Sequence, residues 1–142
     1  MATFVKFNKF LEHLAEKNHN LGADALKIAL TNTAPTMATD VTFDAVTDHA
    51  APAEAHGYTS GGHAVTVDAS SEAGGTYTLA CTTAVVITAS GGTIGPFRYV
   101  ILYNSTPATN NLIACWDYGS SITLADGEKF TATPAGSLLT LV

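Results

Sequence analysis

The sequence predicts an all-β protein, mainly an antiparallel β-sandwich or a jelly-roll-like barrel, with one amphipathic helix at the N-terminus. Three observations support this fold class. Apolar residues keep a helical spacing only near the N-terminus. Further along, short segments alternate apolar and polar residues, as half-buried strands do. Turn-forming groups rich in Gly, Asn and Pro separate these segments at intervals typical of sandwiches and barrels.

A helix is expected over about residues 4–20. Its apolar face has four residues at i, i+3, i+4 and i+7: Phe7, Phe10, Leu11 and Leu14. Thr3 is a candidate N-cap, because its hydroxyl can accept a hydrogen bond from a first-turn backbone N–H. Gly22 suits the left-handed residue that often ends a helix. We therefore expect the apolar face to pack on the sheets.

Strands are expected wherever the period changes to two. The expected segments are residues 26–31, 63–67, 76–81, 84–88, 99–103, 112–118, 122–124, 129–132 and 138–142, with a short strand near 41–43. The apolar run 84–88 predicts burial on both faces. Trp116 and Tyr118 share a face with Leu112 and Ala114, so all four are expected in the core. Gly74-Gly75 predicts a turn, and Asp126-Gly127 predicts a hairpin.

The 142 residues fit a single domain, 1–142. Within it, a β-rich core is expected over residues 62–142. Residues 33–61 form a long irregular segment that contains Pro35, Pro52, Gly57 and Gly61. A segment of this length in a compact domain usually has a function.

The charge content limits the classes of partner. Charged residues make up 13% of the chain, against about a quarter in ordinary soluble proteins. Interface cores are depleted in charge in the same way. The net charge is −6 and Lys plus Arg number six, without a basic cluster, so neither nucleic acid nor an anionic membrane surface is an expected partner. The N-terminus lacks a long apolar run, which argues against a secretory signal and favours a cytoplasmic site of synthesis.

Sequence motifs of catalysis and metal binding are absent. The chain has no G-x-S-x-G elbow, no phosphate-binding Gly-Lys loop, no H-E-x-x-H pair and no C-x-x-C pair. We therefore expect no enzyme activity and no cofactor. Asp40, Asp44 and Asp48 are read as a solvated acidic loop, with a calcium site as the alternative. Cys81 and Cys115 are expected as buried thiols, and their pairing stays open.

A few residues have the composition of a protein interface. Arg98, the chain's one arginine, lies between Phe97 and Tyr99, and an arginine beside aromatic residues is typical of hot spots. The alternative is that Arg98 pairs with an acid on the solvent face of a strand. The long irregular segment adds four candidates, because loops on a β scaffold often bind partners: Asp44, His49, His56 and Tyr58.

Several segments resemble those of tailed-bacteriophage virion proteins. They are FNKF at 7–10, NHNLG at 18–22, LKIALTNT at 26–33, GYTSGG at 57–62, GGTIGPFRY at 91–99 and WDYGS at 116–120. The resemblance extends over nearly the whole chain, which is similar to a small phage structural protein of the head-decoration or cement type. The resemblance implies a β-rich subunit without catalytic residues, assembled in the host cytoplasm and located in the virion. It implies docking on the major capsid protein or another virion protein, and self-association as dimers or trimers.

The expected function is therefore that of a capsid decoration protein that binds and stabilises the assembled phage head. A tail, connector or fibre component of the virion is the alternative. A carbohydrate-binding β-sandwich is a further alternative, which would use exposed aromatic side chains. Its candidates are Tyr58, Tyr103, Trp116 and Tyr118.

Overall fold

The computed structural model describes residues 2–44, 49, 51–133 and 138–142. As predicted, the protein is mainly β, with antiparallel sheets and one short helix near the N-terminus. The elements are β1 (Thr3–Lys6), α1 (Asn8–Ala15), β2 (Leu26–Thr31), β3 (His63–Val65), β4 (Ala69–Ala73), β5 (Thr76–Ala80), β6 (Val85–Thr88), β7 (Ile94–Asn104), β8 (Leu112–Leu124), β9 (Lys129–Ala132) and β10 (Leu139–Leu141).

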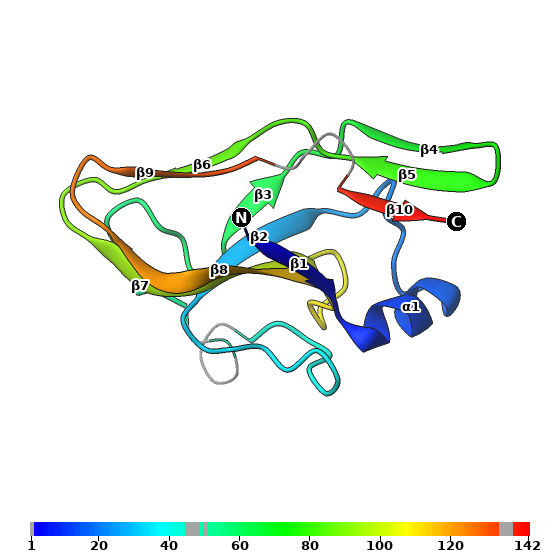
Figure 1. The fold of residues 1–142 in the computed structure, drawn as a ribbon, viewed down its shortest axis with the longest axis horizontal. Helices are drawn as coiled ribbons and strands as arrows, with labels where there is room; N and C mark the ends of the chain where they lie inside the picture. The colour runs from blue at the N-terminus through cyan, green and yellow to red at the C-terminus, as the bar shows by residue number, and fades with distance from the viewer. Residues whose placement is uncertain (1, 45–48, 50, 134–137) are drawn as a thin grey trace.

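The strands lie in two layers. The first layer is a five-stranded sheet with the order β1-β8-β7-β2-β3, in which every pair is antiparallel. The second layer consists of a three-stranded sheet, β10-β5-β4, and the two-stranded ribbon β6-β9. Figure 1 shows this second layer running along one face of the five-stranded sheet, with the irregular segment that follows β2 on the opposite face. The arrangement is that of a β-sandwich in which the segment after β2 also covers the outer face of the five-stranded sheet.

A bent ribbon connects the two layers. The β7–β8 ladder ends with Ile94 opposite Leu124, and the β6–β9 ladder begins with Thr88 opposite Lys129. Between them, the Ala89 N–H donates to the Glu128 carbonyl at 2.9 Å. The two strands of the ribbon therefore bend together from one layer to the other, at the left of Figure 1.

Of the two predicted turns, the one at this corner does not close a hairpin, and the other does. Asp126-Gly127 does not form a hairpin, because β8 pairs with β7 and β9 pairs with β6. The dipeptide specifies a turn but not the partner of the strand that follows it. Gly74 and Gly75, by contrast, close the β4–β5 hairpin directly, with φ of 61° and 86°. Two positive φ values suit the two-residue turn that matches strand twist.

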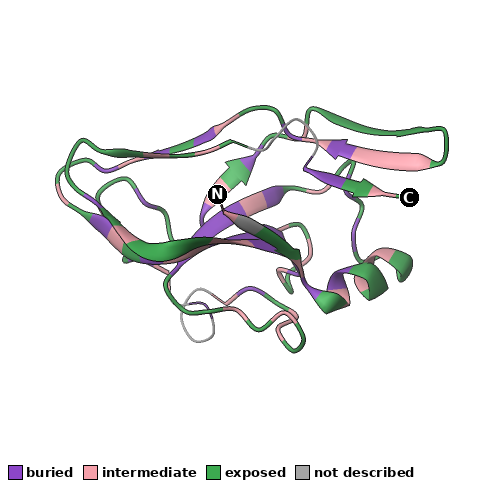
Figure 2. Cartoon of the chain, in the orientation of Figure 1, coloured by how far each residue is buried: buried purple, intermediate pink, exposed green. Residues whose placement is uncertain are grey.

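The five-stranded sheet is buried on both faces. The interlayer face, which is turned toward the second layer, contributes Leu26, Ile28 and Leu102 to the larger core. The outer face, covered by the segment after β2, forms a smaller core that contains Phe7, Phe43, Ile101, Tyr103 and Leu112. This double burial explains why the central strands β2 and β7 are buried along most of their length in Figure 2.

The helix is shorter than the sequence predicted. Residues Thr3–Lys6, expected in the helix, form β1 and pair with β8. The helix starts at Asn8, with Phe7 as an N-cap residue that makes no side-chain cap, so the prediction of Thr3 as the cap is wrong. Phe7 and Phe10 are buried, whereas Leu11 is 50% exposed. The helical spacing begins only at Phe7, and pairing with β8 satisfies the backbone N–H and C=O groups of the stretch before it.

The helix also ends earlier than predicted. The Lys17 N–H donates to the Leu14 carbonyl and the Asn18 N–H to the His13 carbonyl, at 3.3 and 2.8 Å. These two bonds form a Schellman motif, whose left-handed position is Lys17, with φ of 67°. Gly22 was predicted for this position. This helix end could not be predicted from the sequence, because lysine is uncommon in the left-handed region.

A β-bulge decides which face the residues of β8 occupy. Leu102 lies opposite Ala114, but Tyr103 lies opposite Leu112, so Ile113 has no partner across the ladder. The extra residue turns Leu112 to the outer face, whereas Ala114 belongs to the interlayer core. The prediction that these residues share one face is therefore wrong.

Three further expectations need correction. Tyr118 is 53% exposed, although Trp116 packs in part against the interlayer core. Val86 is 49% exposed, so β6 is covered on one face rather than two. The short strand near 41–43 is reduced to one isolated bridge, between Thr42 and Asn111. The strand β4 was not predicted, because its sequence ASSEA lacks an apolar alternation.

Candidate functional site

Arg98 forms an ion pair with an acid, as the alternative interpretation of this residue expected. Its Nε and Nη2 atoms donate to the two carboxylate oxygens of Asp117, at 2.8 and 2.9 Å. The ion pair is open to solvent, since both side chains are more than a third exposed. The pairing holds the pKa of Asp117 below its usual range and raises that of Arg98. The pair joins β7 to β8, and Arg98 also lies 5.2 Å from the centre of the Tyr99 ring.

The other two predicted interface residues of β7 pack on different faces of the sheet. Phe97 is fully buried in the interlayer core and packs edge-on against Phe130, with 5.1 Å between ring centres. Tyr99, by contrast, packs against the core of the outer face. Phe97, Arg98 and Tyr99 therefore do not form one surface patch, because the β7–β8 ladder shifts register between Phe97 and Tyr99 and the two rings lie on opposite faces of the sheet.

The irregular segment holds His49 in a buried cluster. The His49 ring is stacked on Phe43 at 5.7 Å, and Phe43 in turn is stacked on Tyr103 at 4.5 Å. The His49 Nε2 atom lies 3.2 Å from a carboxylate oxygen of Asp40, and its Nδ1 atom accepts from the Asp44 N–H at 3.4 Å. These contacts position the segment on the outer face of the sheet. Contact of His49 itself with a partner would require the cluster to open.

Tyr58 and His56 have different surroundings in the same segment. Tyr58 is 2% exposed, and its hydroxyl accepts a hydrogen bond from the Leu30 N–H at 3.0 Å. His56 is exposed, and its ring lies over Gly92, where a Cβ atom would collide with it. Of the four candidates in the segment, His56 is thus the one whose side chain is open to a partner, and Asp44 is half-buried. Their role in binding stays a prediction.

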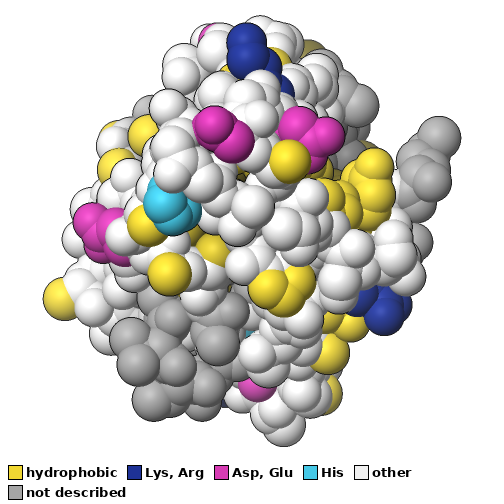
Figure 3. Space-filling model, turned by 90° about the vertical axis from the view of Figure 1, so that its left-hand side faces the viewer, with side chains coloured by type: hydrophobic (Ala, Val, Ile, Leu, Met, Phe, Trp, Pro, Cys, Tyr) yellow, Lys and Arg dark blue, Asp and Glu magenta, His cyan; other side chains and the backbone are white. Residues whose placement is uncertain are grey.

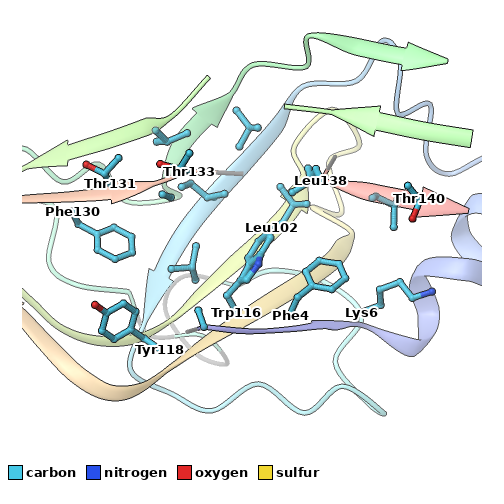
Figure 4. Close-up of a pocket in the computed structure, with 17 residues that line it drawn as sticks. Phe4, Lys6, Leu102, Trp116, Tyr118, Phe130, Thr131, Thr133, Leu138 and Thr140 are labelled. Carbon is cyan, nitrogen blue, oxygen red and sulfur yellow. The ribbon is translucent and has the colours of Figure 1, made fainter. Parts of the chain in front are cut away.

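An apolar cleft lies between the two layers. It has a volume of about 650 Å³ and is bounded by β1 and β8 below and by β9 and β10 above. Its floor reaches Ile28 and Leu102 of the interlayer core. Figure 4 shows side chains of both layers pointing into it. The sandwich is therefore incompletely closed along its β1 side.

Aromatic rings line the mouth of this cleft. Phe4 is 40% exposed and lies 5.3 Å from Trp116, measured between ring centres. Tyr118 lies 6.4 Å from Phe130, which comes from the opposite layer. In Figure 4 these four rings lie along the cleft, with Lys6 at its far end, near Thr140. Lys6 is the one charged side chain among the described residues that line the cleft.

On one face of the molecule, the exposed apolar side chains are scattered. On the face of the molecule in Figure 3, hydrophobic side chains form small separate patches between uncharged polar atoms. Single exposed apolar residues are ordinary on a protein surface, whereas contiguous patches and clefts mark sites of interaction. The cleft is therefore the candidate binding site.

The sequence interpretation did not identify most of this site. Trp116 and Tyr118 were considered as sugar-binding candidates, but Phe4, Lys6 and Phe130 were not considered. The alternation of Thr3, Phe4, Val5 and Lys6 would have indicated an edge strand. Helical spacing of the residues that follow concealed this signal.

The described residues include neither a cluster of metal-ligating side chains nor a helix long enough to span a membrane. Within the described ranges, no three His, Cys, Asp or Glu side chains lie close enough together to hold a metal ion. The calcium alternative included Asp48, which lies outside the described residues. The helix that the structure describes is too short to cross a membrane.

Both cysteines are free and buried. Burial raises the pKa of the Cys81 thiol to about 11 and that of Cys115 to about 12, with nearby Asp68 and Asp117 adding to the two shifts. Both thiols therefore stay protonated at neutral pH, as expected of packing residues.

We compared the chain with models of known protein families, with curated proteins and with solved structures, and nothing in the three comparisons matches it.

Proposed function

We propose that this chain is a non-enzymatic structural subunit of a phage virion, of the head-decoration type. It would bind the assembled capsid and copies of itself, and so stabilise the shell. The observation that carries the proposal is the apolar cleft between the layers, with exposed aromatic rings at its mouth. The resemblance of the sequence to phage virion proteins supplies the capsid as the partner.

The cleft suits an extended protein segment. Its walls end in β1 in the first layer and β10 in the second, each of which has one neighbour among the described strands. An edge strand can pair with an incoming strand through its backbone, and alternate side chains of that strand then fill apolar pockets. Binding that requires the assembled lattice stabilises the lattice by mass action. Weak single contacts suffice there, because copies on a repeating surface gain avidity.

The test measures binding to empty phage heads assembled without this chain. Wild-type protein should sediment with the heads and raise the temperature at which they fall apart. Tyr118→Lys places a charge in the cleft mouth and should weaken binding at least tenfold. Val86→Lys is the matched control, since Val86 is similarly exposed but does not line the cleft, and it should bind like the wild type.

Two results would refute the proposal: no binding of the wild type to heads, or equal binding of Tyr118→Lys. Electron microscopy of labelled protein on virions distinguishes the head from the alternative location in a tail, connector or fibre. Label at the capsid symmetry axes supports the decoration role, and label at one pole contradicts it.

A carbohydrate-binding module is a second candidate, since Trp116 and Tyr118 line the same cleft as the hydroxyl-bearing Thr131, Thr133 and Thr140. Aromatic faces and hydroxyl groups together are what a sugar requires. Binding on a glycan array that is lost in Trp116→Ala, without binding to heads, would favour this candidate.

A further inference from the structure

Few hydrogen bonds attach α1 and the loop after it to the rest of the described chain. This α1 segment, residues 9–24, lies at one end of the sandwich (Figure 1). The hydrogen bonds that the structure describes between it and any residue beyond 25 all involve Asn104, the last residue of β7. The Asn104 Nδ2 atom lies 3.1 Å from His19 Nδ1 and also donates to a carboxylate oxygen of Asp24. One amide therefore provides the polar attachment of the segment.

The Asn104 amide fixes which ring nitrogen of His19 carries the proton. Its Oδ1 atom accepts from the Thr106 N–H at 3.0 Å and its Nδ2 atom donates to Asp24, so the amide has one favourable orientation. Nδ2 therefore faces His19 as a donor, and His19 Nδ1 is the acceptor. The neutral ring has its single proton on Nε2, a buried atom without a hydrogen-bond partner among the described residues.

A second proton on His19 is incompatible with these contacts. It would have to bind Nδ1, where the new N–H would point at the N–H of Asn104. The amide cannot turn away without losing its bonds to Asp24 and Thr106. The ring is 5% exposed and lies 5.3 Å from the ring of Phe10, measured between centres, so the positive charge would also be buried against an apolar surface.

The charged neighbours of His19 do not offset this cost. Among the described residues, the titratable groups that act on it by charge are His13 of α1 and Asp24 of the loop, and β7 contributes the neutral Asn104. The His13 ring lies 5.8 Å from His19 between centres, so a positive His13 repels a second positive charge. Burial has the largest influence, repulsion by His13 comes next and attraction to Asp24 is the smallest. Together they lower the pKa of His19 to about 4.

We propose that His19 is an acid-sensitive switch, whose protonation releases the α1 segment while the two strand layers stay folded. The chain is anchored on both sides of the segment. The Phe7 N–H donates to the Ile113 carbonyl at 3.1 Å, and the Ala25 N–H donates to the Thr106 hydroxyl at 2.7 Å. Between these anchors, α1 has eight residues, too few to stay helical in water without tertiary packing. The inference does not depend on the proposed function.

The apolar contacts that open with the segment are few. The segment contributes two buried side chains, Phe10 and Leu21, to the larger core, and Leu14 packs against that core in part. The size of the pH effect follows from the two states of His19. Its pKa is about 4 in the closed segment and the ordinary 6.5 in the open one, so the open form binds the proton more tightly. Between pH 7 and pH 4, the ratio of open to closed segment should therefore rise about a hundredfold.

Hydrogen exchange measured by NMR on the full chain tests the switch. The amides of Asn18 and Asp24 are hydrogen-bonded inside the segment, to the carbonyls of His13 and Asn20. After correction for intrinsic exchange rates, their protection should fall about a hundredfold between pH 7 and pH 4. The Ile101 amide, on the central strand β7, should keep its protection. Nitrogen spectra of the ring should show the Nε2–H tautomer of His19 at pH 7.

Three variants separate His19 from the other histidines. His19→Gln can still accept the hydrogen bond of Asn104 but does not titrate, so protection of its segment should not depend on pH. His13→Gln removes the repelling charge, so its segment should open at a higher pH than that of the wild type. His56→Gln is the matched control, since His56 is exposed and lies outside the segment, and it should behave as the wild type.

Three results would each overturn the proposal. The first is a measured pKa of His19 at or above 6.5, which would mean that the charged ring stays in the closed segment beside Asp24. The second is the same pH dependence of exchange in His19→Gln as in the wild type. The third is loss of protection at Ile101 in parallel with Asn18, which would mean that the whole sandwich unfolds. If His19→Gln does not fold, the ring titration and amide exchange of the wild type decide.

Discussion

Replacement of Tyr58 by phenylalanine tests how the long irregular segment is attached to the sheet. The β2–β3 ladder pairs Leu26, Lys27 and Ile28 and then stops. Two residues further on, the Leu30 N–H donates to the Tyr58 hydroxyl at 3.0 Å, so a side chain takes the place of a neighbouring strand. Burial raises the pKa of Tyr58 to about 12, so its hydroxyl remains protonated in ordinary buffers.

Tyr58→Phe keeps the ring and removes only the acceptor oxygen. Tyr58 and Leu30 are both buried, so water cannot replace the lost partner. A buried N–H without an acceptor costs about 1–3 kcal/mol, and we expect the free energy of unfolding to fall by that amount. Tyr58→Ala also empties the space of the ring and should cost about 3–5 kcal/mol. The difference between the variants separates the hydrogen bond from packing.

Urea denaturation followed by circular dichroism measures these losses, and hydrogen exchange of the Leu30 amide reports on the bond directly. Tyr118→Phe is the control, since Tyr118 is exposed and its change should stay within about 0.5 kcal/mol. If Tyr58→Phe is as stable as the wild type and the Leu30 amide exchanges equally slowly, the hydroxyl does not complete the edge of β2, and the reasoning is refuted.

Three further predictions concern α1 and its surroundings. Phe10→Ala should cost about 3–5 kcal/mol in urea denaturation, whereas Leu11→Ala, at an exposed position, should cost little. Burial, with His13 nearby, lowers the pKa of His19 to about 4 from an ordinary 6.5. The unfolded chain therefore binds this proton more readily, and stability should fall by about 3 kcal/mol as the pH drops from 6.5 to 4, a loss that His19→Gln should remove. Lys17→Gly should raise the melting temperature, since glycine relieves about 1 kcal/mol of left-handed strain that Lys17→Ala retains.

Local sequence patterns predicted many of the strands correctly. Residues 26–31 and 129–132 form strands with the predicted bounds, and Gly74-Gly75 forms a turn. These features succeed because period-two alternation and paired glycines constrain the backbone within a few residues. The mainly β fold class follows from them.

Other features depended on contacts between distant residues. Whether Thr3–Lys6 joins the helix or forms β1 is decided by β8, more than a hundred residues further along the chain. The bulge at Ile113 reverses the faces of β8, which a strict alternation cannot reveal. The turn at Asp126-Gly127 is local, but its role as a corner between layers is not.

The sequence by itself determined the strand-forming segments, the low charge and the position of the aromatic residues. The tertiary structure alone decided that Phe4, Trp116, Tyr118 and Phe130 line one cleft, because they come from three strands in two layers. It also decided that the side chains of Phe97 and Tyr58 are buried. The physical reason is that backbone propensity acts over a few residues, whereas burial depends on which surfaces the whole chain brings together.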